Sequence, residues 1–116
     1  MERRLAAILA ADVVGYSRLM GEDEAGTLNA LRLLRTEIFA PTVDGHRGKV
    51  VKSMGDGWLV EFASVVDAVT CAIKVQERLT GHDIIKLRVG VHLGDITHED
   101  EDIFGDGVNI AARLQE

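Results

Sequence analysis

This chain has little of several residue types, and each shortage excludes a class of protein. It contains one cysteine, Cys71, so no internal disulfide can form, and a reducing compartment, the cytoplasm, is expected. It contains one proline, which argues against long extended linkers. No apolar run approaches the length of a membrane-spanning helix, so we expect no membrane segment in these 116 residues. The formal net charge of -6 disfavours general binding to nucleic acid.

Two common catalytic motifs are also missing from the sequence. It has no Gly-x-x-x-x-Gly-Lys-Ser/Thr phosphate loop and no Gly-x-Ser-x-Gly nucleophile elbow, which disfavours P-loop ATPases and serine hydrolases. The composition that remains is that of a globular protein, 47% hydrophobic, and the length suits one domain with a real core. Because a bound metal ion can invert the local charge, the acidic balance does not exclude nucleotide binding.

The first half of the chain predicts a strand and then a helix. Residues 4–14 form a near-continuous apolar run, which is typical of a central strand covered on both faces; a signal peptide is the weaker alternative. Residues 21–24 begin a helix with acidic side chains in its first turn, and the helical spacing continues up to Pro41. The apolar positions of this helix are Leu28, Leu31, Leu34 and Ile38.

The second half predicts a hairpin, a helix and another strand. Residues 48–54 and 57–62 are short apolar segments around a glycine-rich turn, which indicates a hairpin. Ser64 caps a helix that ends at Gly81, and alternation over residues 84–94 indicates a strand. The apolar face expected of the helix is Val65, Ala68, Val69, Ala72, Ile73 and Leu79. The strand is expected to lead into an acidic loop with Asp95, Glu99, Asp100, Glu101 and Asp102.

The order of these elements is strand, helix, hairpin, helix, strand. It predicts an α+β fold of the ferredoxin-like βαββαβ type, an antiparallel sheet with helices on one face and the other face left to find cover. A further helical pattern runs from Gly107 to Gln115. No repeat, low-complexity segment or domain boundary interrupts the sequence, so residues 1–116 are interpreted as one domain.

Two aspartates lie at the edges of apolar runs, beside glycines. Asp12 is either the exit of a strand into water or a metal ligand, and Asp56, in a Gly-Asp-Gly turn, is either a turn residue or a ligand. Because the first strand and the hairpin are natural neighbours in this fold, the two carboxylates could share divalent metal over a phosphate chain. The glycine and backbone N–H groups that follow Asp12 form a natural phosphate cradle. They belong to Gly15, Tyr16 and Ser17.

Two further residues could contact the base of a nucleotide. Lys52 alternates with Val50 and Met54 in an apolar strand, so it either faces solvent or donates to a base nitrogen. Asp102 lies in the acidic stretch, where a solvated turn is the ordinary interpretation.

The last helical pattern also carries two polar residues on one side. Asn109 and Arg113 are spaced i, i+4 and therefore share a helix face. That face is either solvated or arranged for a nucleotide, with the guanidinium forking onto phosphate oxygens and the amide hydrogen-bonding a sugar.

Together these motifs resemble the class III nucleotidyl cyclase catalytic domain, that of the adenylate and guanylate cyclases, and look most like the bacterial adenylate cyclases. The resemblance runs from about Arg4 to the end of the chain. Four segments carry it in the family's order and spacing: residues 11–17 (ADVVGYS), 52–57 (KSMGDG), 88–94 (RVGVHLG) and 102–114 (DIFGDGVNIAARL). The family domain is longer, so the resemblance implies a catalytic domain that lacks its C-terminal part.

The resemblance implies a metal and phosphate site. Asp12 and Asp56 match the family's metal-binding aspartates, with the Val13 carbonyl nearby, and two ions of Mg²⁺ or Mn²⁺ are implied in each site. The turn whose backbone holds phosphates in the family matches Gly15, Tyr16 and Ser17.

The resemblance also implies the substrate and the reaction. Lys52 and Asp102 match the pair that reads adenine, which favours ATP over GTP. Asn109 matches the residue that positions the ribose, and Arg113 the residue that stabilises charge at the α-phosphate. The implied reaction is attack of the ribose 3′-hydroxyl on the α-phosphate, giving 3′,5′-cyclic AMP and pyrophosphate.

The family builds its sites between two subunits, and this chain carries both sets of residues. A head-to-tail homodimer with two equivalent sites is therefore implied. The alternative is a catalytically inactive fragment of a larger cyclase that binds nucleotide or a cyclase partner. A diguanylate cyclase is disfavoured because the Gly-Gly-Asp/Glu-Glu-Phe hairpin is absent, and a plain structural domain would have to contain four motifs by accident.

Overall fold

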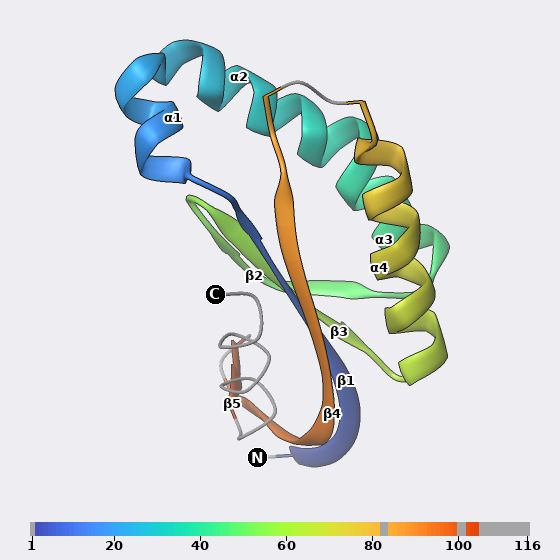
Figure 1. Ribbon diagram of the computed structural model, residues 1–116. Coiled ribbons are helices and arrows are strands. Elements are labelled where there is room, and N and C mark those ends of the chain that lie inside the picture. The colour runs from blue at the N-terminus through green and yellow to red at the C-terminus, as the bar shows by residue number, and fades with distance from the viewer. Residues whose placement is uncertain (1, 82–83, 100–101, 105–116) are drawn as a thin grey trace.

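The computed structural model describes residues 2–81, 84–99 and 102–104 of the chain. Figure 1 shows the elements in their order along it. They are β1 (Glu2–Val13), α1 (Tyr16–Glu22), α2 (Glu24–Leu34), the π-helix η1 (Arg35–Phe39), α3 (Ala40–Gly45), β2 (Lys49–Met54), β3 (Gly57–Phe62), α4 (Val65–Leu79), β4 (Leu87–Glu99) and β5 (Asp102–Phe104).

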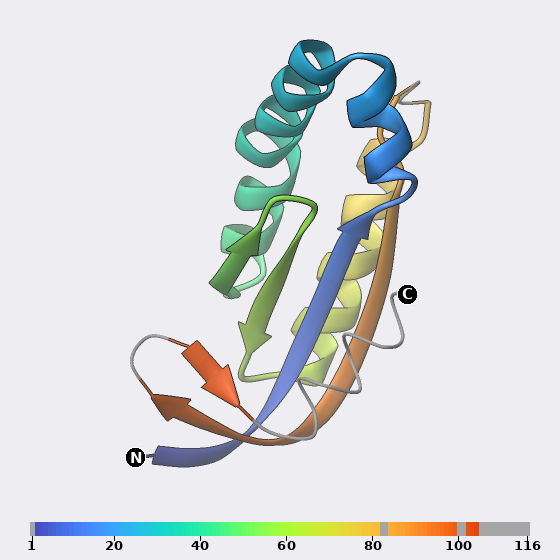
Figure 2. The same cartoon turned by 90° about the vertical axis from the view of Figure 1, so that its left-hand side faces the viewer.

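The strands form one antiparallel sheet in the order β2-β3-β1-β4-β5. The first four strands have the arrangement of a ferredoxin-like βαββαβ sheet, so that prediction is confirmed. The long helices lie together on one side of the sheet, behind the strands in the view of Figure 2. We call that side the helix-covered face and the opposite side the second face.

Strand β1 lies at the centre of the sheet, between β3 and β4. Residues 6–11 are each at most 2% exposed, because this stretch contains no charged side chain and packs on both faces. Side chains alternate between two clusters, as they must in a strand. Ala7, Leu9, Ala11 and Val13 join the helix-covered cluster, whereas Ala6, Ile8 and Ala10 join a smaller cluster with Leu59 on the second face. The prediction of a doubly buried strand is confirmed.

The helical segment after α1 does not end at Pro41, as the sequence analysis expected. It continues through η1 and α3 to Gly45. Proline has no N–H and its ring clashes with the carbonyl four residues earlier, so an uninterrupted α-helix cannot pass it. The chain instead widens into a π-turn just before Pro41, where the Ala40 N–H donates to the Arg35 carbonyl. This turn buries Phe39, whose ring stacks on Trp58 with centroids 4.5 Å apart.

Two of the predicted helix faces are partly wrong. On α4, Ala68, Cys71, Val75 and Leu79 are buried, whereas Val65, Val69 and Ile73 are 41%, 44% and 55% exposed. Successive steps of four residues drift by about 40° around a helix, so a 65–69–73 series leaves the face that 68–71–75 keeps. On α2, Leu28 is likewise exposed, and Thr27 occupies the buried position in its place.

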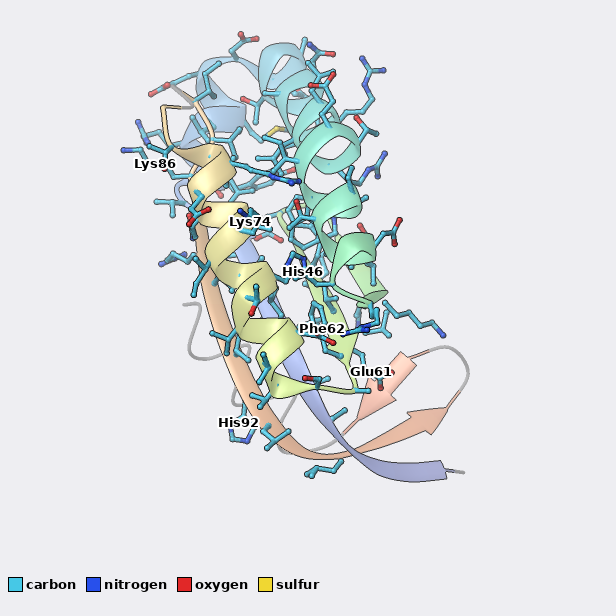
Figure 3. All side chains as sticks on the ribbon, turned by 90° about the vertical axis from the view of Figure 1, so that its right-hand side faces the viewer. His46, Glu61, Phe62, Lys74, Lys86 and His92 are labelled. Carbon is cyan, nitrogen blue, oxygen red and sulfur yellow. The ribbon has the colours of Figure 1, made fainter. Side chains whose placement is uncertain are left out.

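The core between helices and sheet contains the chain's cysteine and one of its few phenylalanines. Phe62, labelled in Figure 3, is 1% exposed and packs between β3 and the helical layer. Cys71 is fully buried, and burial raises the pKa of its thiol to about 11, although Arg78 nearby acts in the opposite direction.

The acidic loop expected after residue 94 is partly a strand. β4 continues through Asp95 to Glu99, and β5 pairs with its end, Asp102 lying opposite Glu99. Charge alone is a poor guide here, because a strand at the end of a sheet tolerates charged residues. Among the described residues, no helix is long and apolar enough to cross a membrane.

Candidate functional site

The two predicted metal aspartates lie at one corner of the sheet. Asp12, near the end of β1, pairs in register with Gly57, the first residue of β3. The next residue of β1, Val13, donates its N–H to the Asp56 carbonyl at 2.8 Å. A backbone hydrogen bond therefore holds the end of β1 against the hairpin tip, and the structure brings together the residues that the sequence pattern linked.

Gly57 permits this close approach. A Cβ atom at Gly57 would lie 2.2 Å from the carbonyl oxygen of Ala11 and 3.1 Å from the Cα of Asp12, both of them backbone atoms. No side chain fits there unless the strands separate, so the second glycine of the Gly-Asp-Gly turn is required by packing rather than by turn geometry.

The predicted phosphate cradle directly follows β1. Gly15 has φ 66° and ψ 33°, the left-handed conformation that glycine adopts without steric cost, and it is the N-cap of α1. Tyr16 bends back over the hairpin, since its hydroxyl lies 3.5 Å from where a Cβ of Gly55 would be. Ser17 is exposed. The Val14 N–H is already bonded to the Lys86 carbonyl at 2.9 Å, so it is one N–H that a phosphate would have to compete for.

Lys52 lies on a different face from the one that simple alternation suggests. The register runs from the pair Val50–Val60 to the pair Lys52–Leu59, so Val51 is an extra residue in a β-bulge. Val60 belongs to the helix-covered cluster and Leu59 to the second-face cluster. Val50 and Lys52 are therefore on opposite faces, contrary to the expected alternation, and Lys52 is exposed on the second face.

Asp12 is also on the second face, two residues beyond Ala10. There it meets an arginine to which the sequence analysis gave no role. Arg88 of β4 lies directly opposite Asp12 in register, and its Nε and Nη2 atoms donate to Oδ1 and Oδ2, each at 3.2 Å. The two residues are 76 positions apart. The only sequence signal for Arg88 was its place in the motif of residues 88–94.

The remaining predicted residues are described less completely. Asp102 begins β5, and β5 comes within 8 Å of β2, Cα to Cα, although the two strands are at opposite ends of the sheet order. The backbone thus brings the strand of Asp102 towards the strand of Lys52. Asn109 and Arg113 lie outside the described residues.

This corner offers few ligands for a metal ion. Among the described residues, no three His, Cys, Asp or Glu side chains cluster as a preformed metal site. Asp12, Asp56 and the Val13 carbonyl are all oxygen donors, and Mg²⁺ is commonly held by one or two carboxylates with substrate phosphates completing its shell. The donor set therefore fits a hard cation that arrives with a phosphate ligand.

Comparison with known proteins places the chain in a family. No family model matches it. It is 52% identical to putative adenylate cyclase 3 of Rhizobium meliloti over 99% of its length, and 34% identical to an adenylate cyclase of Streptomyces coelicolor over 98%. The chain spans only 21% and 30% of those two proteins.

A solved structure decides the matter. The adenylate/guanylate cyclase/hydrolase from Silicibacter pomeroyi superposes with a TM-score of 0.91 at 45% identity, over 98% of this chain and 70% of that one. The chain belongs to the class III adenylate/guanylate cyclase family. The ferredoxin-like sheet is thus the sheet of a cyclase domain.

Proposed function

We propose that this cyclase domain converts ATP to 3′,5′-cyclic AMP and pyrophosphate. The observation that carries the proposal is the corner where Asp12 and Asp56 are held together by the Val13–Asp56 backbone bond, 2.8 Å long. In a chain 45% identical to a solved adenylate/guanylate cyclase/hydrolase, this corner is the natural place for the triphosphate and its metal ions.

Asp12 and Asp56 would hold Mg²⁺ or Mn²⁺, two ions in each site. The bound metal would lower the pKa of the ribose 3′-hydroxyl and neutralise the triphosphate. The protein's own part is positional. The register of β1 with β3 sets Asp12 beside the hairpin tip that carries Asp56, and the backbone N–H groups of Gly15, Tyr16 and Ser17 would face phosphate oxygens.

The nucleotide's other parts would be bound by the residues that match the family motif. Lys52 and Asp102 would read the adenine, and the contact between their strands supports this pairing. Asn109 would position the ribose. Arg113 would stabilise the charge that develops on the α-phosphate in the transition state, an effect typically worth a few kcal/mol.

The test is cyclic AMP production by the 116-residue chain with Mg²⁺ and with Mn²⁺, beside Asp12→Ala. A matched control is Asp67→Ala, which removes a different aspartate that also pairs with an arginine. We expect metal-dependent product from the chain and from the control, and at least about a hundredfold less from Asp12→Ala, consistent with losing several kcal/mol of charge stabilisation. A folded chain that binds ATP with metal but forms no product would support the alternative, a catalytically inactive nucleotide-binding or dimerisation fragment.

The proposed partner is a second copy of the chain, arranged head to tail. Each copy would give Asp12 and Asp56 to one site, and the base-reading and transition-state residues to the other. These latter residues are Lys52, Asp102, Asn109 and Arg113. Asp12→Ala and Arg113→Ala, each inactive alone, should then recover part of the activity when mixed, because one of the two sites in a mixed dimer is intact. Mixed dimers that stay inactive would contradict shared sites.

A further inference from the structure

The ion pair between Arg88 and Asp12 is bidentate, and we call this arrangement a fork. Nε donates to Oδ1 and Nη2 to Oδ2, both at 3.2 Å, so each carboxylate oxygen of Asp12 accepts from the same guanidinium. The two residues face each other across the β1–β4 ladder, and their side chains emerge on the second face of the sheet. A bidentate pair of this kind fixes the orientation as well as the distance of the carboxylate.

The two partners differ in how firmly they are held. The Asp12 side chain is 17% exposed, and its strand is paired on both sides, with Gly57 and with Arg88 itself. The Arg88 side chain is 46% exposed and reaches the carboxylate through a long flexible stem. The arginine can therefore leave without disturbing the sheet, whereas the aspartate cannot.

A metal ion at Asp12 would need the carboxylate oxygens that Arg88 contacts. A cation and a guanidinium cannot both take the same lone pairs at short range, and two positive charges a few ångströms apart repel each other. We infer that Arg88 covers Asp12 while the metal is absent, and that metal binding requires the guanidinium to turn away. Arg88 is then a positioning residue that lowers the affinity for metal. This inference rests on the proposed metal role of Asp12.

The test is Mn²⁺ binding to the nucleotide-free chain, measured by electron paramagnetic resonance of the unbound ion, for the unaltered protein and Arg88→Gln. Loss of the competing cation should tighten Mn²⁺ binding roughly twofold to fivefold, the change that corresponds to a partly exposed ion pair. The matched control is Arg47→Gln. Arg47 forms a similar fork with Asp67, with both contacts at 3.3 Å, and its loss should leave the Mn²⁺ affinity unchanged.

The outcomes separate this inference from the proposed function. Mn²⁺ binding that is lost in Asp12→Asn, yet equal or weaker in Arg88→Gln, would overturn the inference and leave the metal role of Asp12 intact. Binding unaffected by Asp12→Asn would overturn the metal role of Asp12 and the inference with it. No binding even to Arg88→Gln would overturn the inference alone, because the donor set at Asp12 fits a cation that arrives with a phosphate ligand.

A second measurement needs no substitution at Arg88. In the NMR spectrum of the unaltered protein, the chemical shift of the Arg88 Nε–H group reports its hydrogen bond to Asp12. Mg²⁺ should shift that resonance towards the position of a solvated arginine, with the same midpoint as metal binding. A resonance that stays in place while Mg²⁺ binds would show that the fork survives, and would contradict the inference.

Discussion

The helix-covered face and the second face of the sheet differ in the side chains that they carry. On the helix-covered face, Trp58 and Val60 of β3 join a large buried cluster. On the second face, the neighbouring positions carry a smaller cluster of Leu59 with Ala6, Ile8 and Ala10 of β1, and at its border lie Asp12 and Lys52. Because consecutive residues of a strand point in opposite directions, one short segment supplies stability on one side and candidate chemistry on the other. Substitutions one residue apart should therefore have different consequences.

The largest effect should come from the helix-covered face. Trp58 is 5% exposed and its ring stacks on Phe39, so Trp58→Ala should lower the free energy of unfolding by about 3–5 kcal/mol. Lys52→Ala, on the second face, should change it by less than about 0.5 kcal/mol, because Lys52 is exposed. Urea unfolding measures both values. Equal losses of unfolding free energy would show that both faces contribute equally to stability.

A smaller effect should come from shifting the β2 register. Deleting Val51 removes the bulge but keeps Lys52 opposite Leu59, whereas deleting Ser53 moves Lys52 opposite Trp58, on the helix-covered face. We expect the Val51 deletion to cost about 1 kcal/mol and the Ser53 deletion about 2–3 kcal/mol more, because it directs a charge towards the core.

Binding of ATP with Mn²⁺ gives the second readout for these two deletions. Binding should persist in the Val51 deletion variant and be lost in the Ser53 deletion variant. Equal binding by both variants would mean that the face of Lys52 is unimportant.

A further effect appears only at alkaline pH and concerns the helix-covered face alone. Burial raises the pKa of Cys71 from 9.0 to about 11, so the folded state favours the neutral thiol. The resulting stability is complete below pH 9 and is lost as the pH rises towards 11, by roughly 2–3 kcal/mol. Urea unfolding between pH 8 and 11 should show this loss, and Cys71→Ala should reduce it. An unchanged slope in Cys71→Ala would assign the alkaline sensitivity to other groups.

Local patterns were sufficient to predict much of the fold. β1 is buried on both faces because its apolar run has no charge before Asp12, and the hairpin around Asp56 follows from the glycines of its turn. Those two elements are neighbours in a βαββαβ sheet, so the approach of the end of β1 to the hairpin tip could also be anticipated. The π-turn before Pro41 could in principle have been foreseen, because a helix that passes a proline must lose a hydrogen bond.

Other features depend on contacts that no local pattern contains. The fork between Arg88 and Asp12 joins residues 76 positions apart, and it exists only because β1 and β4 pair in one register. The bulge at Val51 reverses the alternation of β2, so counting residues from Val50 does not give the face on which Lys52 lies. Part of the exposed side of α4 was assigned to its buried face because Val69 and Ile73 are as apolar as the residues that pack.

The hydrogen bond from Val13 to Asp56 allows the opening of this corner to be measured by hydrogen exchange. Its donor is a backbone amide, 2.8 Å from its acceptor, and the hydrogen can be replaced by deuterium from the solvent only when the bond opens. The exchange rate of this proton would therefore report how often the end of β1 separates from the hairpin tip. If the corner opens rarely, it is already ordered before the substrate binds, so binding costs little conformational entropy.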